Sequence, residues 1–137
     1  MVGFPYDDLE GWRSVYPEDV FETQFKKLTD RWQEGLEMLP PDGDKLFCDC
    51  ARSAYLTFKS TYNMIVFVRL RSDISKNRAV LLEIIENERR LVNQMLEIVR
   101  SNSLIGYAAS NHYMFTDRTL SEKLINLEYC EAEIKRI

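Results

Sequence analysis

Apolar residues recur every three or four positions over most of this chain, with polar residues between them. This spacing is typical of amphipathic helices that bury one face. The first predicted helix covers residues 17–39, because Pro17 suits a first helical turn and Pro40-Pro41 ends the helix. We expect this helix to have one buried face, made of Phe21, Phe25, Leu28, Trp32, Leu36 and Leu39.

Two longer helices are predicted over residues 43–71 and 74–101. Asp42 or Asp44 is suited to cap the first of them, and Ser72-Asp73 supplies a turn and a cap before the second. The expected buried positions of the first are Phe47, Ala51, Ala54, Tyr55, Phe58, Tyr62, Ile65, Val66 and Val68. Those of the second are Leu81, Ile84, Ile85, Leu91, Val92, Met95, Ile98 and Val99.

A fourth helix is predicted over residues 119–136, where Thr119 and Glu122 have the spacing of a capping box. Four helices with mostly short connections predict an all-α fold, an antiparallel up-down four-helix bundle over residues 17–137. Residues 1–16 lack helical periodicity but are rich in aromatic side chains, Trp12 among them. We expect this N-terminal arm to pack on the bundle.

The connector between the third and fourth helices is unusual, because it is apolar, aromatic and rich in amides and holds the single histidine, His112. One interpretation is that Asn111 and His112 bond to backbone groups, while Tyr107 and Tyr113 help to plug the end of the bundle. The other is that the same residues form part of a ligand pocket that another domain completes.

The polar and aromatic part of the second helix, which includes Tyr62 and Asn63, leaves two interpretations open as well. These side chains either make hydrogen bonds between helices or face a neighbouring domain or ligand. Together with Trp12, they complete the set of candidate ligand-binding or interface residues.

Composition excludes several classes of function. With 18 basic and 22 acidic residues, the formal net charge is -4, which disfavours nucleic-acid binding. No apolar run is long enough to span a membrane. The odd number of cysteines and the lack of a signal segment favour a cytoplasmic location. We expect Cys48, Cys50 and Cys130 to be small buried residues rather than disulfide or zinc ligands.

Self-contained catalysis has little support in the residues. A di-iron bundle needs Glu-x-x-His, but Ala109 precedes His112 at that spacing. The five glycines never form a phosphate loop. Glutamates fall mainly on predicted outward faces, as at Glu83, Glu86, Glu97 and Glu122. We therefore predict no catalytic residue, no metal and no cofactor for this chain alone.

Three segments, Gly11–Phe21, Ala51–Tyr55 and Ile105–Tyr113, occur in an order that resembles the helical C-terminal domain of large bacterial glycoside-hydrolase-like proteins. The likeness spans nearly the whole chain. Met114 and Ala108 depart from it, since an aromatic residue and an acid are more usual there. The resemblance implies that a preceding domain of the parent protein acts on carbohydrate, and it carries over no catalytic residue.

The sequence thus predicts a non-catalytic helical accessory domain that packs on a catalytic domain of the same parent chain and edges its sugar-binding pocket. The alternative is a freestanding helical module for protein–protein interaction or self-association. Both expect the same surface, formed by the arm, the polar part of the second helix and the His112 connector. Carbohydrate is the ligand class that the first hypothesis implies.

Overall fold

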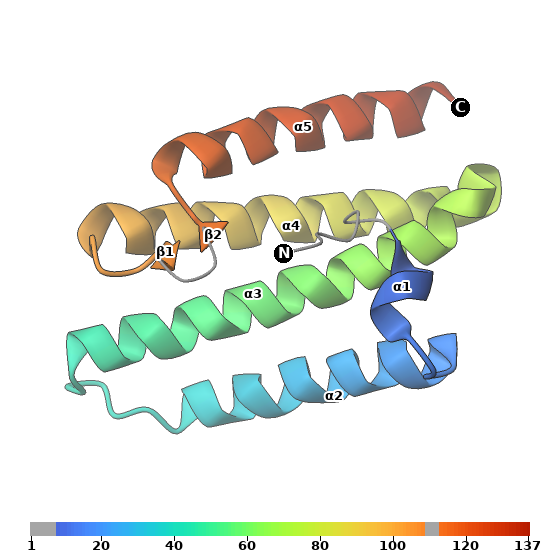
Figure 1. The fold of residues 1–137 in the computed structure, drawn as a ribbon. Coiled ribbons are helices and arrows are strands. Elements are labelled where there is room, and N and C mark those ends of the chain that lie inside the picture. Colours follow the sequence, from blue (N-terminus) through green and yellow to red (C-terminus); the bar gives the residue numbers. More distant parts are fainter. Residues whose placement is uncertain (1–7, 109–112) are drawn as a thin grey trace.

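The computed structural model describes residues 8–108 and 113–137 and consists mainly of four long helices packed antiparallel (Figure 1). The elements are α1 (Leu9–Arg13), α2 (Glu18–Glu37), α3 (Lys45–Leu70), the 3-10 turn η1 (Arg71–Asp73), α4 (Ile74–Ser101), β1 (Tyr107–Ala108), β2 (Tyr113–Met114) and α5 (Asp117–Arg136). The predicted all-α class is confirmed. The predicted helix over 74–101 has the observed bounds, the helix predicted over 119–136 starts two residues too late but ends as predicted, and the other two differ by one or two residues at each end.

Packing follows the order of the chain: α2 lies on α3, α3 on α4, and α4 on α5. In Figure 1 these helices form a row, with α2 and α5 at its two edges. The buried apolar side chains of the described residues all belong to α3, α4 and α5. The core therefore lies among these three helices, and α2 is an outer layer.

The buried face expected for the first helix is only partly buried, because Thr29 is the only residue of α2 that is fully shielded from water. Phe21 and Phe25 are half-buried, and their rings lie 5.0 Å apart. Leu28 is 37% exposed and Trp32 36%, although the Trp32 ring packs edge-on against Phe58. The cause is geometric: α2 packs extensively on α3 alone, so part of its apolar stripe has no helix over it.

Polar side chains set the starts of the long helices. Asp44 accepts a hydrogen bond from the backbone of Phe47 at 2.8 Å, and Asp73 accepts one from Lys76 at 3.1 Å. Both were expected as caps. The predicted cap at Thr119 is wrong, because Thr116 and Thr119 bond reciprocally to each other's backbone amides and start α5 at Asp117.

The connector before α5 contains a short antiparallel pairing that the sequence did not predict. Tyr107 pairs with Met114 and Ala108 with Tyr113. Gly106 precedes the first strand with φ of 100°, and a Cβ there would lie 2.3 Å from the carbonyl oxygen of Phe115. Only glycine fits this close approach without strain.

Two further expectations concern the arm and the cysteines. The sequence of the arm lacks helical periodicity, but the arm contains the short helix α1, where Asp8 accepts a hydrogen bond from the Gly11 amide. All three cysteines are free thiols; Cys48 and Cys130 are half-buried, whereas Cys50 is exposed and so contradicts the expected burial. Among the described helices, none combines the length and the apolar character needed to cross a membrane.

Candidate functional site

Two of the buried polar residues, Asn63 and Glu88, form a network that joins three helices. Asn63 of α3 donates from its side-chain amide to Glu88 of α4 at 2.8 Å and to Asn87 at 2.7 Å. Ser60 donates to the other carboxylate oxygen of Glu88 at 2.9 Å. Lys123 of α5 lies 2.6 Å from that same oxygen. Both oxygens of the buried Glu88 carboxylate therefore have partners, as a buried charge requires.

The buried apolar residues form two clusters, and Leu127 of α5 packs against both of them. One cluster is made of Leu56, Leu91, Val92, Met95, Leu96, Ile98 and Leu120. The other, smaller cluster is made of Leu81, Ile85 and Ile134. Because the polar partners meet only when α3, α4 and α5 are in one relative position, the network favours a single alignment of the three helices.

A second buried acid lies near the end of the helix row. Asp49 of α3 is 5% exposed and accepts a hydrogen bond from Lys45 at 2.5 Å. The same lysine lies 3.3 Å from Ser101 at the end of α4. The hydrogen bond from Lys45, with help from the side chain of Asn102, lowers the pKa of Asp49 below its ordinary value. Asp49 thus connects the start of α3 to the end of α4.

We expect Asp49→Asn to lower the free energy of unfolding by about 1–2 kcal/mol at pH 7, since a charge-assisted hydrogen bond is lost. The pKa of this carboxyl is lower in the folded state, so its contribution exists above the unfolded value of 3.8 and disappears as the pH falls through the folded value. Urea denaturation of both proteins at pH 7 and pH 3 measures this difference. The difference in the free energy of unfolding between wild type and Asp49→Asn should be smaller at pH 3 than at pH 7.

The exposed Glu83 offers a matched control, because it lies on the outer face of α4. Glu83→Gln should change the stability by less than about 0.5 kcal/mol at both pH values. A difference between wild type and Asp49→Asn that stayed constant from pH 7 to pH 3 would contradict the lowered pKa.

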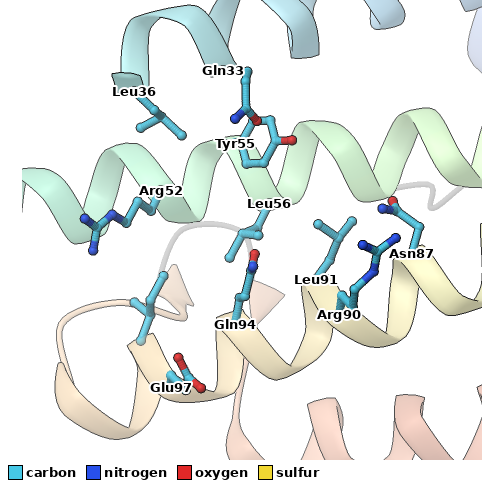
Figure 2. A pocket seen from close by; sticks show the side chains of 11 residues that line it. Gln33, Leu36, Arg52, Tyr55, Leu56, Asn87, Arg90, Leu91, Gln94 and Glu97 are labelled. Carbon is cyan, nitrogen blue, oxygen red and sulfur yellow. The ribbon is translucent and has the colours of Figure 1, made fainter. Parts of the chain in front are cut away.

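A groove of about 520 Å³ lies over α3, between α2 and α4 (Figure 2). Its apolar lining comes from all three helices and consists of Leu36, Leu56, Leu91 and Ile98. Its polar lining consists of Gln33, Asn87 and Gln94, the hydroxyl-bearing Tyr55, and the charged Arg52, Arg90 and Glu97. The lining is therefore mainly polar, with an apolar floor of four side chains.

Several polar groups of the groove have no partner inside the described protein, and Arg52, Arg90 and Gln94 among them are exposed to water. Tyr55 and Gln94 make no hydrogen bond to a described residue, and Arg52 and Arg90 make neither a hydrogen bond nor an ion pair with one. Burial raises the pKa of Tyr55, so its phenol is a neutral donor and acceptor at pH 7. Figure 2 shows Arg90 beside Asn87, with Arg52 apart on α3.

A smaller hollow of about 440 Å³ lies between α1 and α2. It is aromatic on both sides, since Trp12 and Tyr16 line it together with Phe21 and Phe25. The backbone carbonyl of Tyr16 accepts a hydrogen bond from Arg13 at 3.0 Å, which holds the segment after α1 in place.

Among the sequence-predicted candidates, Trp12, Tyr62 and Asn63 have described side chains, and their surroundings differ. Trp12 lies in the hollow next to α2, and Asn63 belongs to the buried network. Tyr62 is half-buried on α3, where Lys59 lies 4.8 Å from its ring centroid. Burial raises the pKa of Tyr62 and lowers that of Lys59.

The connector candidates are described less fully. The backbones of Tyr107 and Tyr113 belong to β1 and β2. Asn111 and His112 lie outside the described residues.

Sequence reasoning missed Glu88, Asp49 and the residues of the groove. A signal for Glu88 exists, because it lies seven residues from both Leu81 and Met95 on the buried face of α4. Glu88 thus lies on the buried face of its helix. The glutamates that were predicted to point outward are all exposed: Glu83, Glu86, Glu97 and Glu122. Asp49, Leu56 and Asn63 follow the same seven-residue spacing on α3.

Within residues 8–108 and 113–137, no group of His, Cys, Asp and Glu side chains is placed to hold a metal ion. The groove offers donors, acceptors and apolar contact, which serve binding and orientation. Comparisons with protein-family models, with curated proteins and with solved structures found no match for this chain.

Proposed function

We propose that this chain is a non-catalytic helical accessory domain that packs on the catalytic domain of a carbohydrate-active, glycoside-hydrolase-like protein. The observation that supports docking is the incomplete burial of α2, an amphipathic helix with one buried residue. We call the exposed apolar part of this helix the α2 face, made of Val20, Leu28 and Trp32. The carbohydrate-active partner follows from the resemblance of the three sequence segments.

The α2 face has the character of a docking surface. Its three side chains are each 36–38% exposed, and the aromatic hollow at the start of α2 continues the apolar surface. Aromatic residues are enriched in the buried centres of interfaces. A domain that covers this face would remove apolar area from water, at about 25 cal/mol for each Å².

The test begins with the reading frame that flanks this chain in its gene. If it encodes a further domain, that domain and this chain are produced as separate polypeptides, and their affinity is measured by titration calorimetry. We expect them to associate, and we expect Leu28→Glu to weaken the association at least about tenfold by placing a charge in the interface. Val80→Glu is the matched control, because Val80 is also an exposed apolar residue, at 44%, but lies on α4.

Every other outcome decides against the proposal. A frame with no further domain, or two polypeptides that do not associate, overturns it. Equal effects of Leu28→Glu and Val80→Glu would remove α2 as the docking surface. Sedimentation of the chain alone tests the alternative: a dimer that Leu28→Glu dissociates would identify a self-association module instead.

A further inference from the structure

We propose that the groove between α2, α3 and α4 binds a small hydroxycarboxylate, a molecule with one carboxylate and several hydroxyl groups. This inference does not depend on the docking of α2 to another domain. It rests on unused charged and polar groups that line one hollow of suitable size.

The charge of the ligand follows from the arginines. Several arginines of the described structure have carboxylate partners, as in the pairs Arg31–Glu34 and Arg100–Asp117, whereas Arg78 donates to the backbone carbonyl of Lys135. Arg52 and Arg90 have none among the described residues, and both line the groove. A guanidinium binds a carboxylate through two parallel hydrogen bonds, so an anionic ligand group suits this site.

The helix register places the carboxylate at Arg90. Lys45 reaches Ser101 and Ser60 reaches Glu88, so Arg52 lies level with about residue 95 of α4. Glu97 is therefore near the level of Arg52 and offsets its charge. Arg90 is about 7 Å away along the helix axis and has no acid beside it in the groove lining. Arg52 also interacts with the charge of Asp49, so Arg90 is the arginine of the lining that best suits a ligand carboxylate.

The uncharged polar side chains of the groove suit a ligand with hydroxyl groups. The phenol of Tyr55 and the amide of Gln94 both donate and accept hydrogen bonds, and neither is used within the described structure. Asn87 accepts from Asn63, which leaves its amide nitrogen to donate. The buried Leu56 and Leu91 supply an apolar floor for the carbon chain. A volume of about 520 Å³ lies within the usual range of ligand sites.

The test is a titration of the ¹⁵N-labelled chain, followed by NMR at pH 7 and constant ionic strength. Four probes separate the recognised features: D-gluconate, its neutral analogue D-glucitol, acetate and inorganic phosphate. We expect gluconate to shift the side-chain amides of Asn87 and Gln94 and the Nε–H of Arg90. We expect glucitol, acetate and phosphate to bind at least about tenfold more weakly, because each lacks the carboxylate or the hydroxyl groups.

Variants assign the binding to the groove. Arg90→Gln should weaken gluconate binding at least about tenfold. Gln94→Leu should also weaken gluconate binding, and glucitol should bind this variant no better than it binds the wild type. Arg118→Gln is the matched control, because Arg118 is an exposed arginine of α5 outside the groove lining. Circular dichroism checks that each variant is folded, and Arg90→Met replaces Arg90→Gln if the latter is not.

Three results would overturn the inference. If glucitol bound as tightly as gluconate, the groove would not recognise a carboxylate. If acetate or phosphate bound as tightly as gluconate, the groove would be a simple anion site. Gluconate shifts that persist in Arg90→Gln, or that are absent in the wild type, would place no such site in the groove.

Discussion

Replacement of Glu88 by alanine is expected to lower the free energy of unfolding by about 3 kcal/mol, a large share of the stability of a single domain. The substitution removes the acceptor that Ser60, Asn63 and Lys123 share. Asn63 is itself 4% exposed, so its amide would lose a partner in a place with little access to water. Urea denaturation at pH 7, followed by circular dichroism, measures the change.

Two variants make this result specific. Glu88→Gln keeps the shape of the side chain and loses the charge that faces Lys123, so its expected cost is smaller, about 1 kcal/mol. Lys123 is 40% exposed and can turn to water, which limits that cost. Glu83→Ala removes an exposed glutamate from the same helix and should cost less than about 0.5 kcal/mol. Equal costs for Glu83→Ala and Glu88→Ala would contradict the buried network.

The second large effect is a difference in stability between two leucine-to-alanine variants, one in the core and one in the outer helix α2. Leu81→Ala should cost about 3 kcal/mol, because Leu81 has no exposed surface and packs with Ile85 and Ile134. Leu28→Ala should cost less than about 1 kcal/mol, because Leu28 is 37% exposed on α2 and its removal leaves no closed cavity. Chemical denaturation of the two variants side by side gives the comparison.

The outcome also bears on the proposed function. A cost at Leu28 close to that at Leu81 would mean that α2 belongs to the closed core, and the α2 face would then not be available to a second domain. The predicted order of costs agrees with an α2 that packs on one helix and keeps part of its apolar stripe in contact with water.

Local signals in the sequence predicted the helices and most of their ends. Asp73 caps the helix that begins at Ile74, and a break after Ser101 ends it, as expected from turn residues beside a periodic apolar pattern. The start of α5 differed from the prediction. The sequence offers two capping pairs, Thr116 with Thr119 and Thr119 with Glu122, and the structure uses the first. Capping patterns of this kind identify a helix start to within a few residues, since several polar side chains compete for the same amides.

The candidate residues were harder to predict. Asn63 was singled out for its polarity within an apolar helix, and it proved to be buried, but its partner Glu88 lies on another helix. The groove likewise combines Gln33, Tyr55 and Arg90 from three helices. Spacing along one helix does not reveal which faces of different helices meet.

The sequence by itself determined that this chain is all-α, where its long helices run, and that Asp44 and Asp73 begin two of them. These features depend on contacts between residues only a few positions apart. Only the tertiary structure decided that α2 is an outer layer, that Glu88 is buried among three helices, and that Arg52 and Arg90 line one groove. The physical reason is that burial and ion pairing depend on which helix faces meet, and similar amphipathic stripes allow more than one such arrangement.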